Sequence, residues 1–204
     1  GITESRGTAE DILLHDEAAR VLQEEGFVYK YFNHNEQNKG MYGTTFFTKI
    51  EPIQVEKDIE SYEKEGRVIT AIFEHFIVIT TYTPTLGLDR AGNIIKQERR
   101  QRFDEALKKH LRNIRKKYNK PIIFSGDLNC CHKEEDIWDK QLINTDFPSC
   151  TLAERERLQG MLDDIGVVDA YEKGIIDKKH WEEDKNEHTK VEEKNEKKRW
   201  TFFF

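Results

Sequence analysis

Two polar side chains follow directly on a short apolar run near the middle of the chain. The run Pro121-Ile122-Ile123-Phe124 and the glycine after it are typical of a buried strand that ends at a sheet edge. Asp127 and Asn129 stand two residues apart, so in an extended chain both side chains would leave on the same face. A carboxylate and a carboxamide placed in this way could hold a hard cation or orient a water in phosphoester chemistry. On this short motif alone, the plainer interpretation is that they are turn residues that hydrogen-bond to nearby backbone.

The composition limits the kinds of partner that the chain can bind. Of its 204 residues, 36% are apolar and 35% are charged, which suits a single domain over 1–204 that buries a core without disulfides or metals. The segment 172–199 holds nine acidic and nine basic residues, and we expect it to be a charged, flexible insertion. The formal net charge of −6 would not draw the chain to nucleic acid by bulk attraction, so any phosphate binding requires a local basic patch.

The cysteines and the hydropathy pattern favour an intracellular protein with reduced thiols. Cys130, Cys131 and Cys150 make an odd count without CxxC spacing, which argues against a disulfide framework and against a zinc site. No apolar run reaches 18 residues, so we expect neither a membrane span nor a secretory signal. The chain begins with Gly1 rather than Met, which points to processing or to an incomplete N-terminus.

The segments before the central run are predicted to form a helix, a loop and four strands. A helix is expected from Asp16 to a stop at Gly26. The charged run 54–65 is predicted to be a loop. Runs of β-branched and aromatic residues predict strands, the last two of them paired as a hairpin, at 27–32, 44–50, 67–73 and 76–82.

Two further segments have helical patterns. Apolar residues recur every three or four positions over 97–118, with Arg and Lys between them, so this run is predicted to be a helix that follows a loop at 86–95. Thr151 and Glu154 have the spacing of a capping box, and the apolar residues after them predict a second helix that ends at Gly166.

Six short segments, in their order and spacing, carry a resemblance to a known family. They are Lys39-Gly40-Met41-Tyr42-Gly43, Glu65-Gly66-Arg67-Val68-Ile69, Thr81-Tyr82-Thr83-Pro84, Arg100-Gln101-Arg102-Phe103-Asp104-Glu105, Ser125-Gly126-Asp127-Leu128-Asn129 and 151–155. Together they resemble the exonuclease III-type apurinic/apyrimidinic (AP) endonucleases of the endonuclease/exonuclease/phosphatase superfamily, over 27–171 and again at 200–204. The resemblance implies a DNase I-like α/β fold, in which two mixed β-sheets pack as a sandwich with flanking helices.

The resemblance also implies which residues would act on a phosphodiester. Asp127 would handle a proton and lie in the metal site. Asn129 would orient Asp127 there and stabilise the pentacovalent phosphate. Tyr82 would touch the scissile phosphate; its plainer interpretation is an aromatic residue that covers the end of a strand. The implied metal is Mg²⁺, with Mn²⁺ as a substitute.

A second group of residues would contact DNA if the resemblance holds. Arg67 would grip the DNA backbone, Gly40 and Met41 would meet the strand across from the lesion, and Phe202 would line the pocket for a flipped-out abasic sugar. The plainer interpretations are an exposed strand-edge cation for Arg67 and a core residue for Phe202. An abasic sugar is easily extruded because it has little stacking to lose. Backbone contacts would position the duplex without reading its sequence.

The chain departs from the family pattern towards both ends. The family's early asparagine and its metal-binding glutamate would lie before Gly1. The glutamates at 4, 10 and 17 do not end an apolar run, so none of them is assigned to the site. The late aspartate and the terminal Asp-His pair would lie beyond Phe204. The domain is therefore expected to be partial, with weak activity or none as a bare chain.

These observations predict a DNA repair nuclease that uses Mg²⁺ to cut the phosphodiester 5′ to an abasic site in duplex DNA, with 3′–5′ exonuclease or 3′-repair activity as an option. It would act as a monomer away from membranes, in the nucleus of a eukaryote or otherwise in the cytoplasm. Two alternatives stay open. One is an inactive or non-catalytic family member that binds abasic DNA, and the other is a superfamily phosphoesterase acting on RNA or phosphoinositides.

Overall fold

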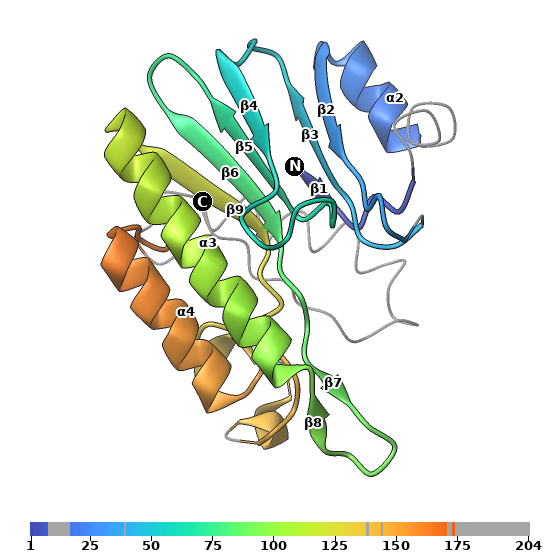
Figure 1. Ribbon diagram of the computed structural model, residues 1–204, viewed down its shortest axis with the longest axis vertical. Helices are drawn as coiled ribbons and strands as arrows, with labels where there is room; N and C mark the ends of the chain where they lie inside the picture. Colours follow the sequence, from blue (N-terminus) through green and yellow to red (C-terminus); the bar gives the residue numbers. More distant parts are fainter. Residues whose placement is uncertain (8–16, 39, 138, 144, 171–172, 174–204) are drawn as a thin grey trace. The chain divides into compact units, whose positions relative to one another are not determined.

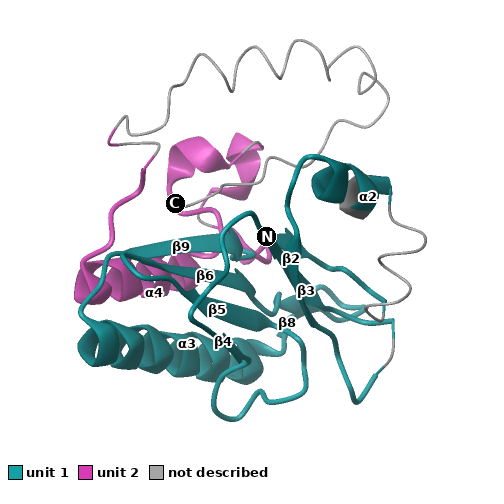
Figure 2. Cartoon of the chain, turned by 90° about the horizontal axis from the view of Figure 1, so that it is seen from above, with its two compact units in different colours: residues 1–129 teal, residues 130–204 magenta. Residues whose placement is uncertain are grey.

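The computed structural model describes residues 1–7, 17–38, 40–137, 139–143, 145–170 and 173. The chain divides into two compact units, Gly1–Asn129 and Cys130–Phe204, which are coloured separately in Figure 2. The proposed flexible insertion at 172–199 falls outside the described residues except for Lys173, and Phe202 lies outside them entirely.

Two β-sheets form the centre of the first unit (Figure 1). The smaller sheet is antiparallel and has the order β1 (Ile2–Thr3), β3 (Thr44–Thr48), β2 (Tyr29–Asn33). The larger sheet is mixed and has the order β4 (Gln54–Lys57), β5 (Val68–Ile72), β6 (Ile77–Tyr82), β9 (Ile122–Asp127). In it β9 runs parallel to β6, and the other neighbours are antiparallel.

The two sheets bury an apolar layer between them. Phe46 of β3 packs with Ile69 and Ala71 of β5 and with Phe73 just beyond it. On β3 the next residue, Phe47, points the other way and packs with Leu22 of helix α2 (Glu17–Glu24), as the two-residue period of a strand requires. The helix ends before Gly26, which has a φ of 88°, so the predicted helix and its stop are confirmed.

Helix α3 (Gln97–Tyr118) covers the other face of the larger sheet, with the bounds that the sequence predicted. Its buried apolar side chains are Phe103, Leu107, Leu111 and Ile114, the stripe expected of an amphipathic helix. The order helix, sheet, sheet, helix confirms the predicted sandwich. No helix among the described residues is long and apolar enough to cross a bilayer.

The hairpin prediction is confirmed, but two predicted loops contain strands. β5 and β6 pair from Ile72 and Ile77, and the Phe73 N–H donates to the Phe76 carbonyl across the turn at 2.9 Å. The run 54–65 is wrong as a loop over its first residues, because Gln54–Lys57 forms the edge strand β4. An edge strand can carry charge on its open side, so its composition gave no strand signal. Within 86–95, the two-residue strands β7 (Gly87–Leu88) and β8 (Ile94–Ile95) pair as a ribbon.

The second unit contains one long helix among its described residues. Helix α4 (Leu152–Ile165) begins at Thr151, whose hydroxyl accepts from the Glu154 N–H at 3.2 Å, and ends at Gly166 with a φ of 69°, so this prediction is confirmed. Two short 3₁₀ turns, Glu134–Asp136 and Lys140–Leu142, precede it. All three cysteines are free thiols. Burial raises the pKa of Cys131 to about 12, which keeps that thiol protonated and unreactive.

A buried histidine makes the stability of the first unit depend on pH. His110 Nε2 of α3 lies 2.8 Å from Thr70 Oγ1 of β5. Burial lowers the pKa of His110 below its ordinary value of 6.5, partly opposed by Glu56. The unfolded chain therefore binds more protons below about pH 6.5. Stability should be complete above that pH and should fall as the pH drops through 6.5 towards the folded-state pKa.

We expect His110→Gln, which can still hydrogen-bond to Thr70, to reduce this loss of stability between pH 7.5 and 5. Urea unfolding midpoints at both pH values measure the effect. His75→Gln is the matched control, since the His75 side chain is 83% exposed. Equal pH slopes for the parent protein and His110→Gln would contradict the assignment.

Candidate active site

The candidate active site lies where β6 and β9 end side by side. The two strands are parallel and in register from Ile77 and Ile122 up to Tyr82 and Asp127. Beyond this last pair the Thr83 N–H donates to the Asp127 carbonyl at 2.8 Å. Parallel strands end at the same edge of a sheet, so two of the residues implied by the resemblance are brought together by backbone pairing alone.

Gly126 allows the two strands to approach this closely. Its φ is 128°, and a Cβ added there would lie 2.6 Å from the backbone nitrogen of Thr81 and closer still to the Thr81 carbonyl oxygen. Backbone atoms of a paired strand cannot move aside without breaking the pairing. Glycine is therefore required one residue before Asp127.

Asn129 reaches Asp127 through a turn rather than along an extended strand. Its φ is 45°, so the expected extended geometry with both side chains on one face is wrong. The Asn129 N–H donates to Asp127 Oδ1 at 2.9 Å, and the carboxamide Nδ2 lies 3.3 Å from Asp127 Oδ2. Nδ2 also donates to the Thr83 carbonyl at 2.8 Å. The pair therefore forms a turn, as the plainer interpretation predicted. The same turn also holds the two side chains together, as the chemical interpretation requires.

Glu4 belongs to this group, although the sequence analysis left it out. It follows the two-residue strand β1, which pairs with β3, and its Oε1 accepts a hydrogen bond from the Tyr82 hydroxyl. The sequence analysis left Glu4 out because it ends no apolar run, whereas the structure brings its carboxylate to the Tyr82 hydroxyl. A two-residue strand has no period to detect, and the pairing that places it is made with Thr44 and Thr45, some forty residues away. A weak local signal was that Ile2 and Thr3 are both β-branched residues, which favour strands.

The surroundings of Tyr82 keep its hydroxyl protonated. Burial raises the pKa of Tyr82 above its ordinary value, and the hydrogen bond to Glu4 and the negative charges of Glu4 and Asp127 raise it further, against the opposing charge of Arg67. The tyrosine is therefore a hydrogen-bond donor throughout the physiological pH range. The carboxylates of Glu4 and Asp127 therefore both lie close enough to the Tyr82 hydroxyl to raise its pKa.

Arg67 is buried, not exposed at a strand edge. Its side chain is 1% exposed. Nε donates to Glu65 Oε2 at 2.6 Å and Nη1 to the Tyr82 carbonyl at 2.9 Å. The guanidinium carbon lies 3.9 Å from the centre of the Tyr42 ring, a cation–π distance. Arg67 thus contacts Tyr82 from behind and presents almost no surface of its own to a ligand.

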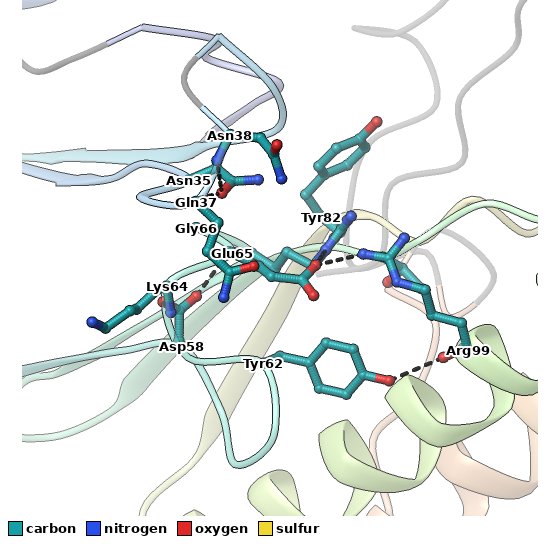
Figure 3. Close-up of polar contacts among 12 residues, drawn as sticks. Asn35, Gln37, Asn38, Asp58, Tyr62, Lys64, Glu65, Gly66, Tyr82 and Arg99 are labelled. Atoms are coloured by element: carbon teal, nitrogen blue, oxygen red, sulfur yellow. Dashed lines mark hydrogen bonds and ion pairs between the residues drawn. The ribbon is translucent and has the colours of Figure 1, made fainter.

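Glu65 joins this buried arginine to helix α3. Figure 3 shows Arg99 reaching the Glu65 carboxylate, and the Nη2–Oε2 distance is 2.6 Å. The Tyr62 hydroxyl donates to the Arg99 carbonyl at 3.0 Å in the same view. The Arg99 side chain is 31% exposed, so it is the more accessible of the two cations that share Glu65.

The other DNA-contact candidates lie on or beyond a turn before β3. Gly40 has a φ of 79°, Met41 is 48% exposed, and Tyr42, with a φ of 63°, turns back to within 6.1 Å of the Tyr82 ring. Phe202 lies outside the described residues, so its predicted role in a sugar pocket stays a prediction.

The donors at this edge suit a hard cation without forming a closed protein cage. Among the described residues no group of three or more His, Cys, Asp and Glu side chains is placed to hold a metal. Glu4, Asp127 and Asn129 supply only oxygen ligands. Mg²⁺ is ordinarily held by one or two carboxylates, with water and substrate phosphate completing its shell, so this donor set fits it.

Solved structures share the fold. The chain matches the AP endonuclease from Archaeoglobus fulgidus with a TM-score of 0.57 and 21% identity, over 79% of this chain and 58% of that one. It matches the 3′–5′ exonuclease NExo from Neisseria meningitidis with a TM-score of 0.58 and 21% identity, over 72% and 54%. The fold is thus the DNase I-like sandwich that the motifs implied.

Sequence relatives then give the family. The chain is 36% identical to an exodeoxyribonuclease of Bacillus subtilis (strain 168) over 154 residues, 74% of this chain and 56% of the relative. It is 30% identical to the DNA repair nuclease APEX1 of Danio rerio over 147 residues, 71% of this chain and 45% of the relative. No family model matches the chain. By these relatives the chain belongs to the exonuclease III-type AP endonuclease family, and it spans about half of their length.

Replacing Gly126 should separate β9 from β6. We expect Gly126→Ala to cost about 3 kcal/mol or more of unfolding free energy, because the added methyl meets Thr81 backbone in a left-handed conformation. Gly160→Ala is the control: a Cβ there meets nothing within 4 Å, and its helical position should gain about 0.5–1 kcal/mol. Urea unfolding of the three proteins measures both effects. A change below about 1 kcal/mol at Gly126 would contradict the packing argument.

Proposed function

We propose that the protein is a DNA repair nuclease that hydrolyses the phosphodiester 5′ to an abasic site in duplex DNA, with 3′–5′ exonuclease or 3′-repair activity as a related reaction. One observation supports this most strongly. Glu4, Tyr82, Asp127 and Asn129, from three separate segments, meet at one sheet edge. The relatives named as an exodeoxyribonuclease and as a DNA repair nuclease point to the same chemistry.

The chain's own residues would divide the work of hydrolysis. Asp127 would take the proton of the attacking water, and its hydrogen bonds with Asn129 would fix the direction of the carboxylate. Tyr82, held protonated, would donate to a non-bridging phosphate oxygen as negative charge builds there. Because Glu4 accepts from the same hydroxyl, substrate binding would exchange that hydrogen bond for one to the phosphate.

Mg²⁺, or Mn²⁺ in its place, would be held by Glu4 and Asp127 with Asn129 beside them. When bound it would neutralise charge on the phosphate and the leaving oxygen. Among the described residues, the carboxylates of Glu4 and Asp127 both lie near the Tyr82 hydroxyl at this edge. The phosphate itself would therefore have to supply part of the metal's shell.

Duplex DNA with an abasic site is the proposed partner. The exposed Met41 and its neighbour Gly40 would meet the strand across from the lesion, and Arg67 would act by holding Tyr82 and Tyr42 in place. We propose a monomer acting inside the cell, in the nucleus of a eukaryote and otherwise in the cytoplasm.

Cleavage of a duplex with one tetrahydrofuran abasic analogue tests the function. We expect nicking 5′ to the analogue with Mg²⁺, none with EDTA, and a loss of about 10³-fold or more in Asp127→Asn. Binding of the abasic duplex without nicking, whichever divalent metal ion is added, would instead show a non-catalytic family member. Faster cleavage of RNA or of a phosphoinositide headgroup than of abasic DNA would place the protein in another branch of the superfamily.

The metal assignment has a separate test that does not need turnover. Titration with Mn²⁺, followed by water proton relaxation, should show one site that Glu4→Gln weakens by about tenfold or more. Glu17→Gln is the control, since the Glu17 side chain is 86% exposed and pairs only with Arg20 on α2 among the contacts described. Equal Mn²⁺ affinity in Glu4→Gln and Glu17→Gln would remove Glu4 from the metal site.

A further inference from the structure

One guanidinium joins three backbone segments around the candidate active site. Arg100 lies in the first turn of α3 and is 3% exposed. Its Nη1 donates to the carbonyls of Pro84 and Asn129, both at 3.0 Å, and its Nη2 donates to the carbonyl of Leu128 at 3.0 Å. Its Nε donates to Asp104 Oδ1, one helical turn further on, at 2.9 Å. Every nitrogen of the side chain therefore has a fixed acceptor.

The three carbonyls belong to the segments that carry the reacting side chains. Pro84 stands two residues after Tyr82, and Leu128 and Asn129 directly follow Asp127. On the other side of the same turn, the Asn129 carboxamide donates to the Thr83 carbonyl. The β6–β9 pairing fixes these segments up to Asp127. Beyond that point Asn129 joins them to each other through the Thr83 carbonyl, and Arg100 joins both of them to α3.

The position of this charge is unfavourable for the helix itself. A cation in the first turn opposes the helix dipole, and a buried charge costs free energy unless it is fully hydrogen-bonded. A guanidinium has no acceptor atom, so Arg100 cannot cap the free N–H groups at the helix start; Lys96, at the N-cap, makes no side-chain cap either. What offsets the cost is the set of carbonyls at the site, which a planar five-donor fork can bind together and a single ammonium cannot.

We propose that Arg100 is a positioning residue of the active site. Its guanidinium holds the turn at 128–129, in which Asn129 is left-handed. Through this turn it keeps the Asn129 carboxamide and the Asp127 carboxylate in the orientation needed for reaction, without touching DNA. The proposal rests on the proposed nuclease function for its kinetic consequence, but the geometry it asserts can be tested without any activity.

The kinetic test compares Arg100→Met with Arg102→Met. Both lose one positive charge from the same helix, but Arg102 is exposed. On the abasic duplex we expect Arg100→Met to lower kcat by about 10²-fold, the scale of a misplaced reacting group, with KM unchanged. Arg102→Met should keep its kcat. Arg100→Lys should recover only part of the loss, and in an Asn129→Ala background Arg100→Met should lower kcat little further, since both act through one group.

The structural test follows amide hydrogen exchange, whatever the activity. The Asn129 N–H donates to Asp127 Oδ1 and should exchange at least tenfold faster in Arg100→Met, while the amides of β6 keep their rates. If Arg100→Met does not fold, Arg100→Lys is measured in its place with the same expectation. Unchanged Asn129 exchange would overturn the proposal even in an inactive protein. Faster exchange throughout the unit would show a general structural role, and a raised KM at constant kcat would show a DNA contact; either result also overturns it.

Discussion

The parallel pairing of β9 with β6 is the constraint on which the site depends. It is a non-local contact, since the two strands are separated in sequence by the ribbon and by α3. It also tolerates no added side-chain atom at Gly126, because Gly126 and the Thr81 backbone meet where no Cβ fits. Tyr82 and Asp127 become neighbours only when this pairing is complete. The geometry of the site therefore depends on the complete larger sheet.

Two buried arginines extend that constraint from backbone to side chains. Arg67 contacts the Tyr82 carbonyl and is covered by Tyr42, and Arg100 contacts the carbonyls on either side of the Asp127 turn. Burying a guanidinium is costly unless each donor is satisfied. Here the acceptors are largely main-chain carbonyls at and just beyond the ends of β6 and β9. The two guanidinium groups therefore bind carbonyls at the ends of β6 and β9 and, in doing so, fix the positions of the polar groups of the candidate site.

The sequence predicted what local pattern can determine. The bounds of α3, the hairpin of β5 and β6 and the capped start of α4 all follow from periodicity or from a short motif. What it missed was set by distant pairing. β4 has edge-strand charge instead of an apolar pattern, and Glu4 enters the site only because two residues of β1 pair with β3. The burial of Arg67 was missed because an arginine at the start of a strand is ordinarily expected to be exposed.

Three residues at the candidate site have strained backbone conformations, which contacts with other segments of the chain hold in place. Glu4, Tyr42 and Asn129 have φ values of 57°, 63° and 45°, and each stands just outside a strand, on a segment that reaches the site. A left-handed conformation costs a non-glycine residue of order 1 kcal/mol or more, and no local pattern in the sequence favours it for Tyr42. The surrounding contacts hold each one: the Tyr82 hydroxyl on Glu4, the Arg67 guanidinium on Tyr42, and Arg100 with Asp127 on Asn129. The polar groups that would meet a phosphodiester are therefore oriented before a substrate arrives, and the folding of the two sheets supplies the free energy that orients them.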